Sequence, residues 1–179
     1  MKYAHIVSSV VNDTVQVDPF SIFSPDYAEQ FVQAPDGIEL GWLFSGGSFT
    51  PPPAPSRVAV VAAKWSAVKA ERDRRKWLGV KVSANWFHSD DSSRIQQLAL
   101  VMLGANIPAG LQWKTLTRTG SVFVSMTQAL AGSIFQSTLQ SDTAVFSAAE
   151  MHRVAIEASA TPESYNILIG WPASFEDSV

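Results

Sequence analysis

A run of prolines is the feature that most constrains how this chain can fold. Four of the five residues from Pro51 to Pro55 are proline. Such a run favours an extended polyproline II conformation and continues neither a helix nor a central strand. The sequence therefore predicts a β-rich N-terminal module over 1–50, a Pro-rich linker over 51–57 and a mixed helix/strand C-terminal domain over 58–179. An ordered surface crossing within a single domain is the alternative interpretation of the same prolines.

The N-terminal module is expected to consist mainly of short strands. Two β-branched runs, 5–11 and 14–17, flank Asn12 and Asp13, which predict a hairpin turn. Further local signals predict one helical turn over 25–31, a turn over 35–37 and a hairpin around 45–47. So few residues leave only a thin hydrophobic core.

The C-terminal domain is expected to alternate helices and strands, so that the whole chain has an α+β fold. A first helix is predicted from Arg57 to about Leu78, with Ser56 as its N-cap and Gly79 as its stop. Its buried face is predicted to carry Val58, Val61, Trp65 and Val68, and its end an ion pair between Glu71 and Arg75.

A second helix is expected to start within Ser89–Ser93 and to end at Asn106–Pro108. Ser93 to Gln96 matches a capping box, and the two aspartates before it suit a helix N-terminus. Its predicted buried stripe is Ile95, Leu98, Ala99, Met102 and Ala105.

The remaining elements include one ambiguous long helix. Thr127 is a predicted N-cap for a helix reaching about Ser159, either continuous or broken near Ser141–Thr143, where residues favour caps and turns. The strands expected around it are a strand or hairpin arm over 80–87, hairpin arms over 112–117 and 122–126, and a final strand over 165–172.

Composition excludes several classes of function. The net charge of −3 argues against a nucleic-acid footprint, and the absence of cysteine removes disulfides and thiolate metal sites. The longest uncharged stretch, 119–141, is interrupted by polar residues and does not predict a membrane helix. Three histidines lie far apart, and no nucleotide-binding or nucleophile motif occurs. We expect no enzyme activity, no catalytic or metal site and no cofactor.

Aromatic residues give the best local signal for recognition. Trp42, Phe44 and Phe49 lie in the thin N-terminal module, where few residues are available to bury them. Exposed aromatic side chains recur as anchors of protein interfaces. These three are the candidate partner-binding residues. The basic run over 69–76 is interpreted instead as a solvated helix end.

Two stretches resemble proteins encoded beside tail-fibre genes in tailed bacteriophages. Residues 31–42, followed by 46–52, look like the opening of many phage tail and tail-fibre-assembly proteins. Residues from about 63 to 171 resemble a C-terminal domain of unknown function common in phage tail proteins. Ser92-Ser93 and the strand–helix entry over 122–127 are looser than the usual pattern. The resemblance implies an association with a phage tail or tail fibre and carries over no catalytic residue.

The resulting expectation is a non-enzymatic phage tail protein that binds a tail-fibre or baseplate protein. It would act as an assembly chaperone in the host cytoplasm or as a component of the virion tail, with homo-oligomers as a further option and neither nucleic acid nor membrane as a partner. The alternative is a host-glycan-binding or glycan-cleaving module in which Trp42 stacks on a sugar.

Overall fold

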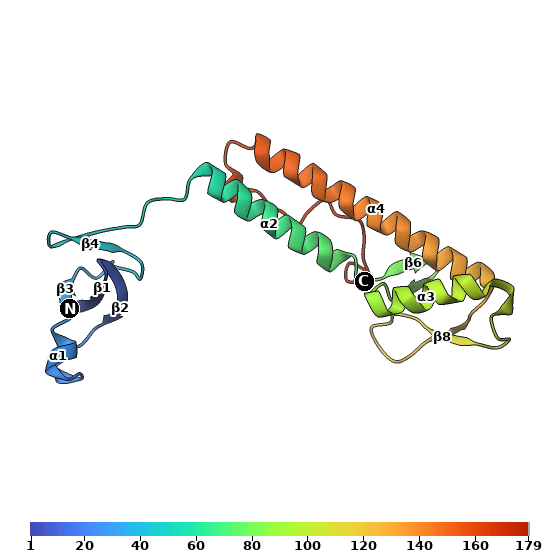
Figure 1. Cartoon of the computed structure of the whole chain (residues 1–179), viewed down its shortest axis with the longest axis horizontal. Helices are drawn as coiled ribbons and strands as arrows, with labels where there is room; N and C mark the ends of the chain where they lie inside the picture. Colours follow the sequence, from blue (N-terminus) through green and yellow to red (C-terminus); the bar gives the residue numbers. More distant parts are fainter. Residues whose placement is uncertain (179) are drawn as a thin grey trace. The chain divides into compact units, whose positions relative to one another are not determined.

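The computed structural model describes residues 1–178 and has an α+β fold, as predicted (Figure 1). The chain divides into two compact units between Pro55 and Ser56, so each unit is described by itself. Helix α2 begins directly after this division, at Arg57.

The N-terminal unit is built on one five-stranded antiparallel sheet in the order β3-β1-β2-β4-β5. Its strands are β1 (Lys2–Val7), β2 (Val10–Val15), β3 (Phe31–Ala34), β4 (Leu43–Ser45) and β5 (Ser48–Thr50). A 3₁₀ turn η1 (Pro19–Ser21) and helix α1 (Pro25–Ala28) connect β2 to β3. The small core beneath the sheet consists of Ala4, Val11, Ala34 and Ile38, with Ile6, Trp42 and Phe49 against it.

The first hairpin turn lies elsewhere than the sequence predicts. Ser8 and Ser9 form it, with φ of 51° and 65°, the positive values that a tight two-residue hairpin turn uses. Asn12 and Asp13 are inside β2, so the prediction of a turn there is wrong. The β1–β2 register shifts beside Ile6, which leaves Asn12 as the extra residue of a β-bulge.

The other local predictions in this unit are confirmed. Helix α1 provides the predicted helical turn. The Ile38 amide donates to the Pro35 carbonyl over 3.2 Å, which closes the turn over 35–37. Gly46 and Gly47, with φ of 55° and 79°, join β4 to β5 as a hairpin.

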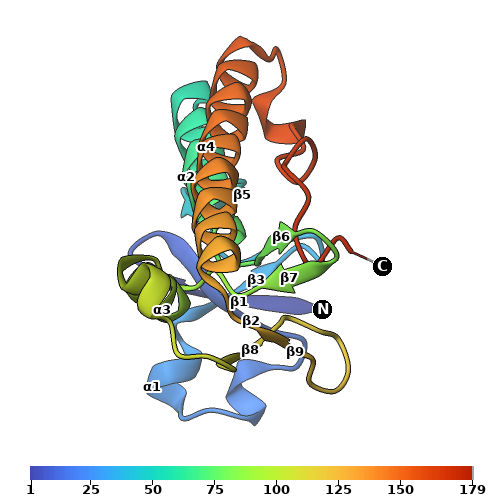
Figure 2. The ribbon, with the colours of Figure 1, turned by 90° about the vertical axis from the view of Figure 1, so that its right-hand side faces the viewer.

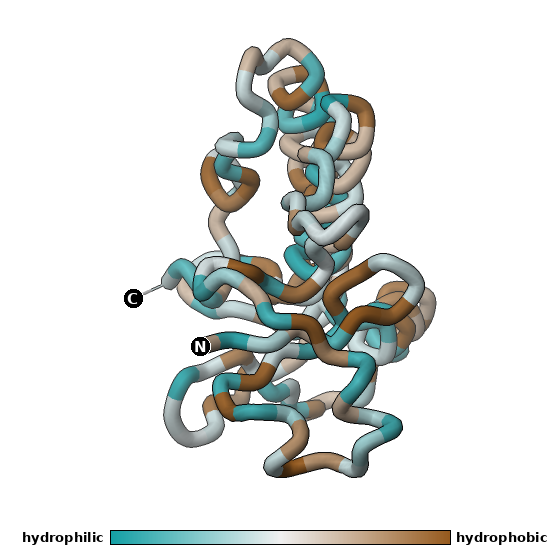
Figure 3. Tube along the Cα trace, turned by 90° about the vertical axis from the view of Figure 1, so that its left-hand side faces the viewer, coloured by the Kyte–Doolittle hydropathy of each residue, from teal (hydrophilic) through white to brown (hydrophobic). Residues whose placement is uncertain are grey.

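The C-terminal unit is organised around two long helices that lie side by side (Figures 1 and 2). These are α2 (Arg57–Arg75) and α4 (Gln128–Ala158). Figure 3 shows hydrophobic and hydrophilic residues intermixed along the helical part of the chain. The N-terminal half of α4 carries the smaller elements: β6 (Val80–Val82), β7 (Asn85–Phe87), α3 (Asp91–Leu103), η2 (Gly104–Asn106), β8 (Gln112–Lys114) and β9 (Phe123–Ser125). A last 3₁₀ turn, η3 (Pro162–Ser164), follows α4.

Helix α4 is continuous, which decides between the two alternatives for this segment. Asp142 does not end the helix, because Arg94 of α3 holds its carboxylate; Thr143 turns its hydroxyl back to the Leu139 carbonyl. The buried residues of α4 repeat at three- and four-residue steps for most of its length: Ala131, Ile134, Thr138, Val145, Ala148, Ala149, His152 and Ile156. This stripe packs on α2 at one end and on α3 and the hairpins at the other.

Helix caps were predicted correctly at two of three starts. The side chains of Ser56 and Thr127 accept hydrogen bonds from the amides of Ala59 and Leu130. The capping box at Ser93 is wrong, because Asp90 is the N-cap of α3 and accepts the Ser93 amide over 3.0 Å. Hydrogen bonds from Ser92 and Ser93 hold the pKa of Asp90 well below its usual range.

The buried face of α3 is the opposite of the predicted one. Gln97 and Leu100 face the core. The predicted stripe is exposed instead: Ile95, Leu98, Ala99, Met102 and Ala105. Gln97 satisfies its buried amide by donating to the His88 carbonyl over 2.7 Å, which fixes this orientation of the helix.

The segment after α4 contains no strand within the described residues, so the strand predicted over 165–172 is wrong. Tyr165, Ile167 and Trp171 pack instead against α2 and α4. The Trp171 indole nitrogen donates to the Ile167 carbonyl over 2.7 Å, a local turn that replaces strand pairing.

Charged residues near the end of α2 bind the C-terminal segment that follows α4, so they are not only a solvated helix end. Buried Glu71 accepts hydrogen bonds from Arg74 and, as predicted, from Arg75 over 2.7 Å. The two guanidiniums also reach Glu176 and Asp177. The hydrogen bond from Arg74, supported by Arg75, lowers the pKa of Glu71 against the opposing effect of burial.

Candidate partner-binding surfaces

Two of the three predicted aromatic residues line one pocket of the N-terminal unit. Trp42 and Phe49 are half-buried against the core of the sheet, and both face a pocket of about 410 Å³. Trp42 is held there by its backbone: the Val11 amide donates to its carbonyl over 2.8 Å. The rest of the lining is Gln33, Pro35, Gly37, Ile38, Gly47 and Ser48.

Phe44 supports the pocket without lining it. It lies directly opposite Phe49 in the β4–β5 hairpin, with the ring centroids 4.7 Å apart. This tilted contact between the rings restricts the Phe49 side chain. The three predicted residues therefore form one aromatic group, in which Trp42 and Phe49 provide the accessible surface.

The pocket combines residues from both edges of the sheet. Gln33 belongs to edge strand β3, and Ser48 to the opposite edge strand β5. The contribution of β3 could not be predicted from the sequence, because local sequence patterns do not determine how strongly a sheet curls and which strands its curling brings together. We call this site the aromatic pocket.

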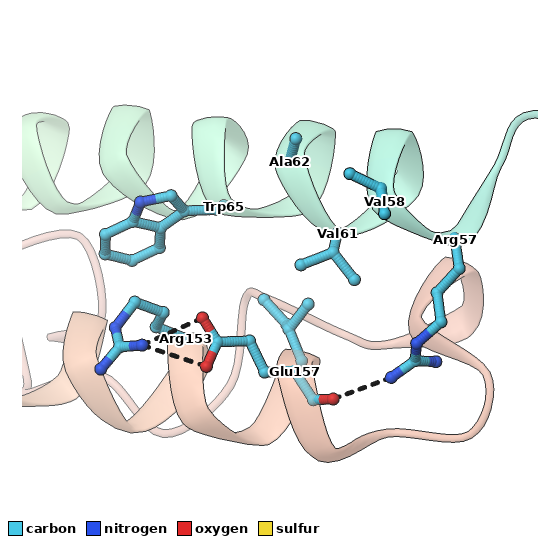
Figure 4. Close-up of a pocket in the computed structure, with 8 residues that line it drawn as sticks. Arg57, Val58, Val61, Ala62, Trp65, Arg153 and Glu157 are labelled. Atoms are coloured by element: carbon cyan, nitrogen blue, oxygen red, sulfur yellow. Dashed lines mark hydrogen bonds and ion pairs between the residues drawn. The ribbon is translucent and has the colours of Figure 1, made fainter.

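A second apolar surface lies between the two long helices (Figure 4). Val58, Val61, Ala62 and Trp65 of α2 face Ile156 of α4 across a groove of about 380 Å³. Arg57, Arg153 and Glu157 form its polar rim. Val58 is 79% exposed, so the first turn of the stripe predicted as core is open to solvent.

A third surface is the exposed face of α3. Ile95 and Met102 are 71% and 80% exposed, and Leu98 and Leu103 are about half exposed. They are neighbours at helical spacing and form one continuous apolar strip. Large side chains gathered in this way usually mark an interaction surface, whereas single exposed apolar residues are ordinary.

A family model described as a domain of unknown function, DUF4376, matches residues 59–168. The chain belongs to the DUF4376 family. No curated protein matches it. The matched region contains α3, α4 and all of α2 except Arg57 and Val58, and with them most of the groove and the exposed α3 face. The aromatic pocket lies outside it.

The two histidines of the DUF4376 region, His88 and His152, lie in different environments. His152 is buried, with its Nδ1 atom 2.9 Å from the Tyr165 hydroxyl and its ring against Trp171. Burial lowers the pKa of His152, and the charge of Arg75 adds to this effect. His88 is more exposed and lies 4.0 Å from an Asp90 oxygen.

The described part of the chain has neither a metal-binding cluster nor a membrane-spanning helix. Residues 1–178 contain no group of three His, Asp or Glu side chains placed to hold a metal ion. No helix in this range is long and apolar enough to cross a bilayer.

Proposed function

We propose that this protein is a bacteriophage tail protein without enzyme activity, which binds the tail fibre through the aromatic pocket. One observation carries the proposal. All the residues that line the pocket fall within 31–42 and 46–52, the two stretches that resemble the opening of phage tail-fibre-assembly proteins. The resemblance and the accessible aromatic surface thus coincide in the same residues.

The chemistry of the pocket suits an apolar segment of another protein. Trp42, Phe49 and Pro35 offer rigid apolar surface, which loses little conformational entropy on binding. Gln33 and Ser48 supply polar groups at the rim that can orient a peptide.

A pull-down with the co-expressed fibre protein tests the proposal. Trp42→Ala should reduce capture at least tenfold, since it removes the largest ring of the pocket. Because Trp42 also touches the core, Ser48→Arg is the second variant: it places a long charged side chain at the pocket and leaves the core untouched. Gln16→Arg, an exposed position outside the pocket, is the matched control. Normal capture by both pocket variants would refute the proposal.

Two roles at the fibre are distinguishable by the composition of mature particles. An assembly chaperone covers the fibre in the host cytoplasm and leaves before the virion is complete. A structural component remains in the virion tail or baseplate. Mass spectrometry of purified virions, set against infected-cell lysate, separates the two.

Glycan binding is the second candidate function, because Gln33 and Ser48 line the pocket beside Trp42. An aromatic ring next to amide and hydroxyl groups is also suited to a sugar. A glycan array decides between the two: binding that depends on Trp42 would favour the sugar, and a blank array combined with fibre capture would favour the protein partner.

A further inference from the structure

The C-terminal unit carries two apolar surfaces that fit one another. One is convex, the exposed face of α3, and the other is concave, the groove between α2 and α4. Laying the apolar face of a helix into an apolar groove is a recurrent mode of protein recognition.

The two surfaces match in length. Ile95 and Met102 on α3 are seven residue steps apart, as are Val58 and Trp65 on α2, which is about 10 Å of helix in each case. Figure 4 shows the Val61 and Trp65 side chains turned toward α4, where they line the groove. Large side chains at three- and four-residue steps form a ridge on a helix, and such a ridge packs into a groove between helices.

Their charges are also complementary. Arg57, at one end of the groove, donates to the carbonyls of Ser159 and Glu157 and forms no ion pair with a carboxylate of the described residues. Asp91 is exposed, four residues before Ile95 and therefore on the same face of α3, and it too has no ion-pair partner within 1–178. Placing the N-terminus of α3 beside Arg57 brings these two opposite charges together.

No copy of the chain can make this contact with itself. Helix α3 packs on α4 around Ile134 and Asp142, whereas the groove lies at Arg153 to Glu157. About 25 Å of rigid helix separates the two places at 1.5 Å per residue. An α3 face that fills the groove must therefore come from a second copy of the chain.

We propose that the occupant of the groove is α3 of a second copy of this chain, with Asp91 of one copy paired to Arg57 of the other. Each copy has one convex and one concave surface. A pair related by a two-fold axis makes the contact twice and closes as a dimer, whereas other arrangements give larger rings or open filaments.

Analytical ultracentrifugation of the full chain over a hundredfold concentration range tests the proposal. The unmodified protein should associate, and Met102→Asp and Val58→Asp should each weaken the association at least tenfold. Both positions are highly exposed, so neither change disturbs the core. Leu168→Asp is the matched control and should leave the association unchanged, because Leu168 is an apolar residue of the same unit, 63% exposed, that lies outside both surfaces.

A charge exchange tests the predicted pairing. Asp91→Arg and Arg57→Asp should each weaken association, and the two changes together should restore it toward the unmodified level. A chain that stays monomeric throughout the range overturns the proposal, even if it binds the fibre protein. So does association that Met102→Asp and Val58→Asp leave intact, or a double variant no stronger than the weaker single one.

Discussion

Arg94 of α3 grips Asp142 of α4 with both terminal nitrogens, at 2.6 Å and 3.0 Å from the two carboxylate oxygens. The same guanidinium donates to the carbonyls of Ser89 and, over 2.8 Å, of Lys76. One side chain thereby joins the end of α2, the start of α3 and the middle of α4. Both members of the ion pair are about three-quarters buried, so solvent screens them little.

Arg94→Ala should destabilise the protein by about 2 kcal/mol, because it leaves a largely buried carboxylate without its partner and removes a hydrogen bond from the carbonyls of Ser89 and Lys76. Urea unfolding followed by far-UV circular dichroism measures the loss. Arg153→Ala is the control, since its ion pairs with Glu150 and Glu157 are more exposed, and it should cost clearly less. Equal losses in the two variants would contradict this account of the Arg94 pair.

Burial of His152 predicts how stability depends on pH. Its pKa is lowered in the folded state, so the unfolded chain takes up the proton first as the pH falls. The stabilisation is therefore fully present above about pH 6.5, the ordinary histidine value, and is lost as the pH drops toward the lowered pKa. The thermal unfolding midpoint should therefore decrease when the pH is lowered from 7.5 to 5.5.

His152→Gln should remove most of that pH dependence, although it also lowers stability at pH 7.5 by changing the bond to Tyr165. His88→Gln is the control and should retain the fall, because the His88 side chain is 40% exposed. A midpoint that is flat in the unmodified protein, or a fall that survives in His152→Gln, would show that another group is responsible.

Gly79 is predicted to tolerate no side chain. It joins α2 to β6 with φ of 86°, and a Cβ atom there would lie 2.6 Å from Leu116 Cδ1 and 3.1 Å from the Phe87 carbonyl oxygen. Gly79→Ala should cost about 3 kcal/mol, from backbone strain and this collision together. Gly120→Ala separates the two causes, because Gly120 also has positive φ but open space around it; it should cost about 1 kcal/mol. Similar costs at both positions would mean that the collision contributes nothing.

Helix caps and turns could be predicted where a single residue type determines the local backbone conformation. Ser56 and Thr127 cap helices because their hydroxyls satisfy free amides, whatever the rest of the chain does. Gly46 and Gly47 mark a hairpin for a similar reason, since they adopt positive φ at little cost. At Ser8 and Ser9 the same backbone conformation occurs without glycine, and the sequence therefore pointed to the wrong turn.

Features that depend on packing could not be predicted. The final segment contains β-forming residues at 167–169, yet Tyr165 and Trp171 find partners on the helix pair rather than on a strand. Likewise, Trp42 was predicted to be accessible to a partner because its module has few residues to bury it. The contribution of Gln33 to the same pocket could not be predicted, because it depends on how the sheet curls. Helix α3 is the clearest case: it is apolar on two sides, so periodicity alone does not say which side is buried.

A pair of leucines tests the orientation of α3 directly. Leu100 is 7% exposed and packs in the core with Phe87 and Ile134, whereas Leu98 is 44% exposed. Leu100→Ala should cost about 3 kcal/mol, because it leaves a cavity, and Leu98→Ala less than about 1 kcal/mol. Urea unfolding at a protein concentration low enough to keep the chain monomeric gives both values. The sequence stripe predicts the reverse order, with Leu98 in the core, so a larger loss at Leu98 would reject the orientation described here. It would also remove the exposed α3 face on which self-association depends.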